Sequence, residues 1–76
     1  MKYLRTENQG FVIFSDHTIH ADMARVLGCG EDNIVVSAGF VRLHDDGEIE
    51  CYGEATSMKI GSKPDDSENL TRRLKA

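Results

Sequence analysis

The sequence of residues 34–56, IVVSAGFVRL-HDDG-EIECYGEAT, decides the fold because two strand-like runs flank a short turn. The first run, residues 34–43, is rich in β-branched and aromatic side chains, which favour a long strand. The Asp-Gly pair that ends at Gly47 tolerates positive φ and suits a tight hairpin. In the second run Ile49 and Cys51 alternate with glutamates, so we expect apolar side chains in the core and glutamates in solvent.

The remainder of the chain predicts two further strands and two helices. Residues 1–5 and 11–14 are strand-like and lie on either side of a turn-rich cluster. Residues 17–27 carry apolar side chains at helical spacing, and Pro64 with the acids that follow it is typical of the first turn of a second helix. The order ββαββα predicts an α+β fold in a single domain, residues 1–76. We expect a four-stranded, largely antiparallel sheet with both helices packed on one side.

Local signals refine these elements. Ser15 or Asp16 is expected to cap the first helix, because a short side-chain oxygen accepts from the open amides of the first turn. Gly39 and Gly53 lie inside strand-like runs, where glycine marks a bulge or a close backbone approach. The expected core draws on the first helix and the strands, and comprises Phe11, Ile13, Ile19, Met23, Leu27, Val36, Phe40, Ile49 and Cys51.

Composition narrows the classes of function. The 76 residues include 9 basic and 13 acidic side chains, and this net charge of −4 opposes the binding of nucleic acid. No apolar run approaches the roughly 18 residues of a membrane span, and the N-terminus lacks the apolar core of a secretory signal. Two cysteines are too few for a disulfide framework. We therefore expect a cytoplasmic protein that binds neither nucleic acid nor a membrane.

Short motifs are spread through the central two-thirds of the chain: HADMA at residues 20–24, SAGFV at 37–41, CYG at 51–53, Ser57, IGS at 60–62 and PDD at 64–66. Together they resemble a group of small uncharacterised proteins encoded by phages and prophages. The resemblance implies a cytoplasmic accessory protein without catalytic residues.

Acidic residues are concentrated in the second half of the chain. Residues 44–69 contain eight acidic and two basic side chains. Carboxylates on alternate residues of a strand lie about 7 Å apart and form an acidic face that attracts basic proteins. We expect a non-enzymatic interaction protein that binds or inhibits a host protein through this face, with Tyr52 as an aromatic anchor. The candidate binding residues are Asp45, Asp46, Glu48, Glu50, Tyr52 and Glu54.

A small zinc-binding protein is the first alternative. His17 and His20 lie three residues apart on the expected helix, and Cys29 could add a softer ligand. The paired ligand spacings typical of structural zinc sites are absent, so we expect neither metal nor other cofactor. His20 then makes an ordinary hydrogen bond at the border of the apolar stripe.

The sequence also bears on catalysis and self-association. Cys51 and His44, across the hairpin, are the local pair that could form a nucleophile and its base, but an inward-facing thiol is a poor nucleophile. We therefore expect no enzymatic activity. A homodimer that forms through an exposed strand edge, or through Leu70 and Leu74, is the second alternative.

Overall fold

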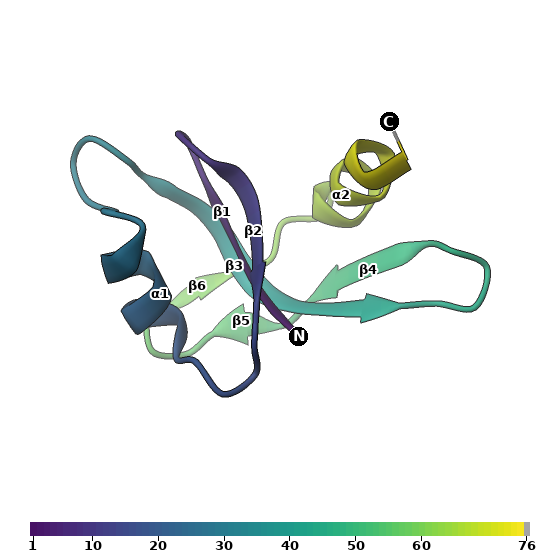
Figure 1. Cartoon of the computed structure of the whole chain (residues 1–76), viewed down its shortest axis with the longest axis horizontal. Helices are drawn as coiled ribbons and strands as arrows, with labels where there is room; N and C mark the ends of the chain where they lie inside the picture. The colour runs from purple at the N-terminus through teal and green to yellow at the C-terminus, as the bar shows by residue number, and fades with distance from the viewer. Residues whose placement is uncertain (76) are drawn as a thin grey trace.

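Four strands form one antiparallel sheet in the computed structural model, which describes residues 1–75 of the chain (Figure 1). The strand order is β2-β1-β3-β4. This sheet and the two helices confirm the predicted α+β class, and a small two-stranded sheet is added to them. The elements are β1 (Lys2–Thr6), β2 (Gly10–Phe14), α1 (His20–Val26), β3 (Val35–Leu43), β4 (Ile49–Tyr52), β5 (Glu54–Ala55), β6 (Ile60–Gly61) and α2 (Asp66–Lys75).

The two helices lie against opposite faces of the sheet. Consecutive residues of a strand point to opposite faces, and Tyr3 and Leu4 of the inner strand β1 are both fully buried. Leu4 belongs to a core cluster with Ala24 of α1, whereas Tyr3 belongs to a second cluster with Leu70 of α2. The expectation of both helices on one side is therefore wrong. Because β1 is apolar on both faces, each face needs its own cover.

The buried core differs from the expected one. Of the nine expected residues only Cys51, at 8% exposure, is buried, and Ile19 is 53% exposed. Val36 and Phe40 are half-buried. Five others are also half-buried, and they pack on the edges of the two clusters: Phe11, Ile13, Met23, Leu27 and Ile49. The expected set omitted the other buried hydrophobic residues, which are Tyr3, Leu4, Phe14, Ala24, Ala38, Val41, Ala55 and Leu70.

Helix α1 begins later than the sequence predicts. Its N-cap residue is Ile19, which has no side-chain oxygen. The expected caps have other partners: Ser15 Oγ accepts from the backbone N–H of His17 at 3.1 Å, and an Asp16 carboxylate oxygen lies 3.2 Å from the N-terminal amine. The chain therefore makes a turn before the helix, and the helix buries His20 in place of Ile19.

Two glycines allow the chain at the end of β4 to pass close to the backbone of β3. A Cβ at Gly39 would collide with the carbonyl oxygen of Tyr52, which confirms the predicted close approach. Gly53 has a φ of 73° and ends the alternation of the strand. As a result Cys51 lies in the core cluster of α2, whereas Ala55 lies in that of α1. The run that the sequence predicts as one strand is therefore two short strands in different sheets.

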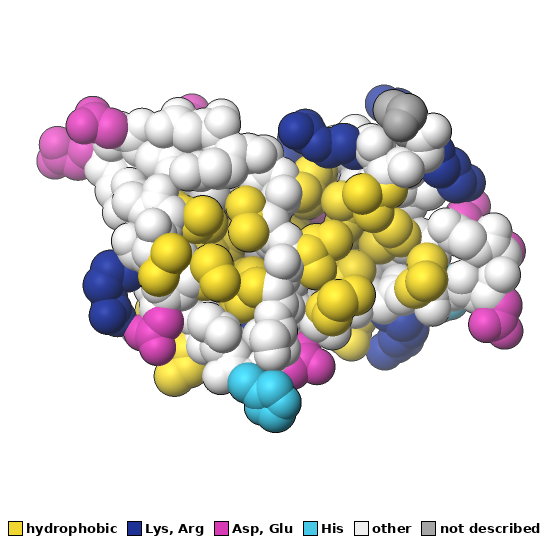
Figure 2. Space-filling model, viewed as in Figure 1, with side chains coloured by type: hydrophobic (Ala, Val, Ile, Leu, Met, Phe, Trp, Pro, Cys, Tyr) yellow, Lys and Arg dark blue, Asp and Glu magenta, His cyan; other side chains and the backbone are white. Residues whose placement is uncertain are grey.

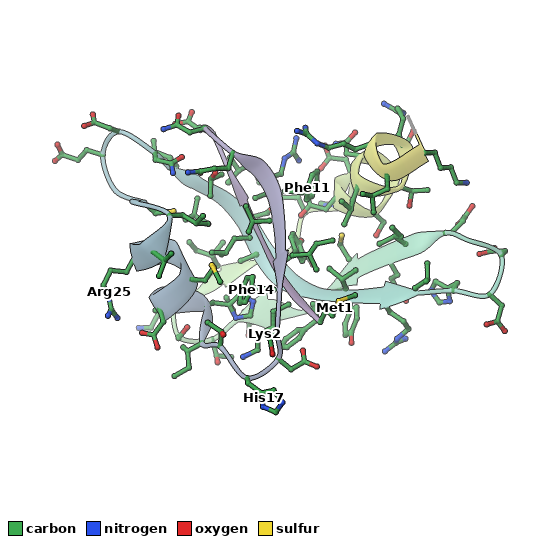
Figure 3. All side chains as sticks on the ribbon, in the orientation of Figure 1. Met1, Lys2, Phe11, Phe14, His17 and Arg25 are labelled. Atoms are coloured by element: carbon green, nitrogen blue, oxygen red, sulfur yellow. The ribbon has the colours of Figure 1, made fainter. Side chains whose placement is uncertain are left out.

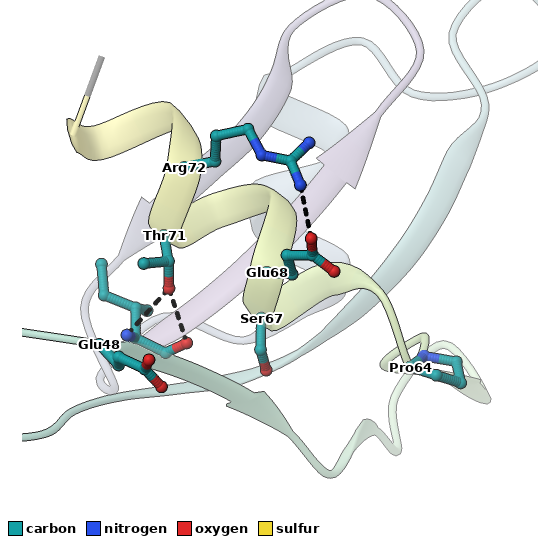
Figure 4. A pocket seen from close by; sticks show the side chains of 7 residues that line it. Glu48, Pro64, Ser67, Glu68, Thr71 and Arg72 are labelled. Carbon is teal, nitrogen blue, oxygen red and sulfur yellow. Dashed lines mark hydrogen bonds and ion pairs between the residues drawn. The ribbon is translucent and has the colours of Figure 1, made fainter.

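Helix α2 covers the outer edge of β4 with two hydroxyl groups one turn apart (Figure 4). The backbone N–H of Ile49 donates to Thr71 Oγ1 at 3.0 Å, and the Thr71 hydroxyl donates to the Ile49 carbonyl at 3.1 Å. Ser67 makes the same pair of bonds with Cys51, at 2.8 and 3.3 Å. The helix thus satisfies edge groups that a further strand would otherwise bind.

Candidate functional site

The β3–β4 hairpin extends beyond the rest of the sheet, and we call its residues 40–52 the arm (Figure 1). Its turn is the predicted one: Gly47 has a φ of 87°, and the N–H of His44 donates to the Glu48 carbonyl at 2.9 Å. One face of the arm packs on α2 through Ile49 and Cys51. The opposite face is polar and aromatic and is therefore the candidate functional site.

Two cross-strand pairs organise this open face. Phe40 pairs with Tyr52, and Arg42 pairs with Glu50. The Arg42 guanidinium carbon lies 4.6 Å from the centre of the Tyr52 ring, a cation–π geometry. The rings of Phe40 and Tyr52 lie 5.8 Å apart. Arg42 and Tyr52 therefore stack on one another within the arm itself.

Glu50 has basic partners within the arm. Its carboxylate lies 2.9 Å from His44 Nε2 and 3.5 Å from an Arg42 nitrogen. The side chains of Glu50, His44 and Arg42 are 40, 46 and 56% exposed, so their pairing is screened by water and contributes little stability. Glu50 thus contributes less open negative charge than the sequence suggests.

The six expected binding residues do not form one continuous row. The structure brings Tyr52 and Glu50 together on the open face of the arm. Glu48 lines a shallow groove beside α2, of about 410 Å³, and Glu54 lies beyond Gly53 in the small sheet (Figure 4). Acidic side chains gather at the outer end of the arm, where the exposed Asp45 and Asp46 occupy the turn (Figure 2).

A chain of aromatic rings connects the arm to the core. Phe14 and His20 meet edge-on at 5.4 Å, and His20 meets Phe40 edge-on at 5.7 Å. His20 is 4% exposed, and its Nε2 lies 2.8 Å from the carbonyl oxygen of Gly39. His20 is therefore a core residue that supports the base of the arm. Its helical spacing from Ala24 was the available signal.

The residues of the metal alternative lie apart. His17 is exposed in the turn before α1 and points away from the body of the protein (Figure 3). His20 is buried, and Cys29 is half-buried against the α1 cluster. Within residues 1–75 no three or more His, Cys, Asp or Glu side chains are placed to hold a metal ion.

A buried carboxylate anchors the start of α2. Asp66 is fully buried and accepts from the Tyr3 hydroxyl at 2.5 Å, from Arg5 at 3.0 Å and from the Lys63 N–H at 3.0 Å. Burial is the largest influence on its pKa and raises it, but the hydrogen bonds from Lys63 and Tyr3 act the other way, and the pKa lies below its ordinary value. Burial and the Asp66 charge also raise the pKa of Tyr3. The sequence placed Asp66 among the acids of the first turn of the second helix and did not indicate that it is buried.

The two cysteines lie in separate clusters, Cys29 with that of α1 and Cys51 with that of α2. Burial, helped by the charge of Asp66, raises the pKa of Cys51 to about 11. Burial also raises the pKa of Cys29. Cys51 faces α2, whereas His44 bonds to Glu50 on the opposite face of the arm. The structure therefore does not bring Cys51 and His44 together.

No protein-family model, curated protein or solved structure matches this chain. The resemblance to phage and prophage proteins stays a prediction. Neither helix of residues 1–75 is long and apolar enough to cross a membrane.

Proposed function

We propose that this chain is a non-enzymatic, cytoplasmic interaction protein of phage or prophage type that binds or inhibits a host protein with a basic surface. The docking element is the arm. The observation that carries the proposal is the Arg42–Tyr52 stack on the open face of the arm, next to the acidic turn.

The stack supplies the anchoring part of the surface. Arg and Tyr are among the residues that contribute most binding energy at protein interfaces. Side chains that are ordered before binding lose less entropy when a partner arrives. Tyr52 contacts both Arg42 and Phe40, which restricts the orientations of its ring.

The acidic turn supplies the long-range electrostatic attraction for the partner. Asp45, Asp46 and Glu48 are exposed at the outer end of the arm, and no basic residue lies between them in the chain. Their combined field speeds the approach of a basic partner and weakens as salt rises. The partner is thus expected to have Lys or Arg at the rim of its site and an aromatic or apolar pocket at the centre.

Two variants of the arm test the proposal with a matched control. Asp45→Lys/Glu48→Lys reverses charge at the turn without touching the Asp46 carboxylate, which accepts from the Glu48 N–H. Tyr52→Ala removes the anchor. The control, Glu31→Lys/Asp32→Lys, makes the same charge change at exposed residues between α1 and β3.

The full-length wild-type chain is used to capture host proteins, and the affinity of a captured protein is then measured against salt. We expect the charge variant to lose the captured protein. Tyr52→Ala should weaken the affinity for that protein by about thirtyfold, as for a hot-spot residue. The control should bind like the wild type. The proposal fails if the charge variant retains the same partner with the same salt dependence.

A further inference from the structure

The outer edge of β2 exposes unpaired backbone groups. Residues of an antiparallel strand bond alternately to one side and the other. The N–H of Val41 donates to the carbonyl of Met1 at 2.8 Å. The backbone N–H and C=O groups of the odd-numbered residues of β1 therefore point toward β3, and those of the even-numbered residues point toward β2. In β2, Val12 therefore bonds inward to β1. The N–H and C=O groups of Phe11 and Ile13 point away from the sheet.

The same alternation correctly identifies the other edge. If Val41 bonds to β1, then Phe40 bonds to β4 through Tyr52, and the outward groups of β4 belong to Ile49 and Cys51. These are the residues that bond to the hydroxyls of α2. In residues 1–75 no side chain makes such bonds to Phe11 or Ile13.

The side chains along β2 suit close contact with another strand. Residues 10–14 contain no charge and no proline, the two features that usually protect an edge strand. Figure 2 shows the bare backbone at the centre of the view with hydrophobic side chains on both sides. Phe11 lies on the α2 side of this backbone and Phe14 on the α1 side (Figure 3).

We propose that β2 pairs antiparallel with β2 of a second copy of this chain, about a two-fold axis at Val12. Phe11 of each copy then faces Ile13 of the other, and the outward N–H and C=O groups of these residues satisfy one another. Val12 faces Val12. This inference is independent of the arm and of its partner.

Two features of the sequence and structure favour a second copy over a foreign strand. The segment GFVIF carries no charge of its own, and its outward groups are symmetric about Val12. The guanidiniums of Arg5 and Arg73 lie beside Phe11 and Gly10, on the same side of Val12 in the chain, so an antiparallel pair places them toward opposite ends. The far edge of the sheet is covered by α2, so association stops at two chains in place of an open filament. The dimer extends one sheet through both copies.

Val12 is the residue at which the proposal can be tested. It is half-buried and belongs to neither core cluster, so a long side chain there can reach solvent. At the axis the two side chains lie about 5 Å apart at Cβ. Val12→Lys and Val12→Glu should each repel their own copy, and an equimolar mixture should pair. Val26→Lys, at a residue that is 79% exposed on α1, is the charge-matched control.

Sedimentation equilibrium of the full chain measures the association. We expect the wild type and Val26→Lys to pass from the mass of one chain to that of two as concentration rises. Each single Val12 variant should associate at least about tenfold more weakly than the wild type. The equimolar mixture of Val12→Lys and Val12→Glu should again form dimers. The proposal is overturned by a wild type that keeps the mass of one chain, by Val12 variants that dimerise like it, or by a mixture that does not recover.

Amide hydrogen exchange of the wild type supplies a measurement that needs no variant. The amides of Phe11 and Ile13 should become protected over the concentration range in which the mass doubles. If the mass doubles while these amides exchange at an unchanged rate, the interface lies elsewhere and the proposal is wrong. This measurement decides the matter should circular dichroism show either Val12 variant to be unfolded.

Discussion

The two edges of the sheet differ in how their backbone groups are satisfied. At β4 the outward N–H and C=O groups of Ile49 and Cys51 bond to hydroxyls of α2. At β2 no group within residues 1–75 bonds to the corresponding N–H and C=O groups of Phe11 and Ile13, which lie among apolar side chains. A helix can therefore close a sheet edge when its hydroxyls have the right spacing, and the edge left open is where association is expected.

The closure of β4 depends on a match of two periods. Residues four apart on a helix lie about 6 Å apart along its axis, and residues two apart on a strand lie about 7 Å apart. Ser67 and Thr71 are four apart, and Cys51 and Ile49 are two apart. Each hydroxyl can therefore both accept from an N–H and donate to a C=O of one strand residue.

The largest effect is expected from the anchor that fixes α2 beside β4. Asp66→Ala leaves the buried Tyr3 hydroxyl and the Arg5 guanidinium without their acceptor, and should lower the free energy of unfolding by about 3 to 4 kcal/mol. Urea unfolding measures it. Asp65→Ala, at a side chain that is 62% exposed, is the control and should cost far less. Equal losses in the two variants would show that Asp66 is not the anchor.

The second effect opens the β4 edge directly. Ser67→Ala/Thr71→Val keeps the shape of the helix but removes both hydroxyls and the four hydrogen bonds they make with Ile49 and Cys51. It should cost about 2 to 3 kcal/mol, at roughly 0.5 to 0.75 kcal/mol for each bond lost from an edge that water can reach. The same variant should form higher assemblies, since both edges are then open. Glu68→Ala, on an exposed residue of the same helix, is the control. An unchanged stability and mass would mean that water replaces the hydroxyls.

The third effect is the acid dependence of the anchor. Because the pKa of Asp66 is lowered in the folded protein, its charge stabilises the fold above the ordinary carboxyl pKa, and this stability is lost as pH falls through the folded value. The stability gap between wild type and Asp66→Asn should therefore narrow below about pH 4. Urea unfolding of both proteins against pH measures it. A gap that does not change with pH would contradict the lowered pKa.

The smallest effect requires no substitution and compares the backbone amides of the two sheet edges in the wild-type protein. In dilute solution the amides of Phe11 and Ile13 should exchange with solvent about a hundredfold faster than those of Ile49 and Cys51, because only the latter are bonded. Exchange followed by NMR measures the four amides in one sample. Similar rates at the two edges would remove the contrast between them.

The sequence predicted what depends on local pattern. Residues 34–56 indicated the hairpin, because its turn needs only Gly47 and its strands need only alternation. The antiparallel sheet and the two helices followed in the same way. The close approach at Gly39 was also predictable, since a glycine inside a strand usually marks a bulge or a place where another backbone comes near.

What the sequence could not predict depends on contacts between distant residues. Tyr3 and Asp66 are 63 residues apart, and neither one alone indicates a buried hydroxyl–carboxylate bond. The burial of His20 depends on the Gly39 carbonyl, which bonds to its ring and lies 19 residues away in the chain. The acidic arm was predicted as one face, but the pairing of Glu50 with Arg42 and the break at Gly53 divide it.

The contrasting surroundings of the two tyrosines provide a built-in optical reporter. The chain has no tryptophan, so excitation of the tyrosine absorption band, where its phenylalanines scarcely absorb, gives emission from Tyr3 and Tyr52. A phenol whose proton is held by a carboxylate emits weakly, and Tyr3 is bonded in this way to Asp66. The light that remains comes mainly from Tyr52 on the arm, so a ligand arriving there is visible without any dye.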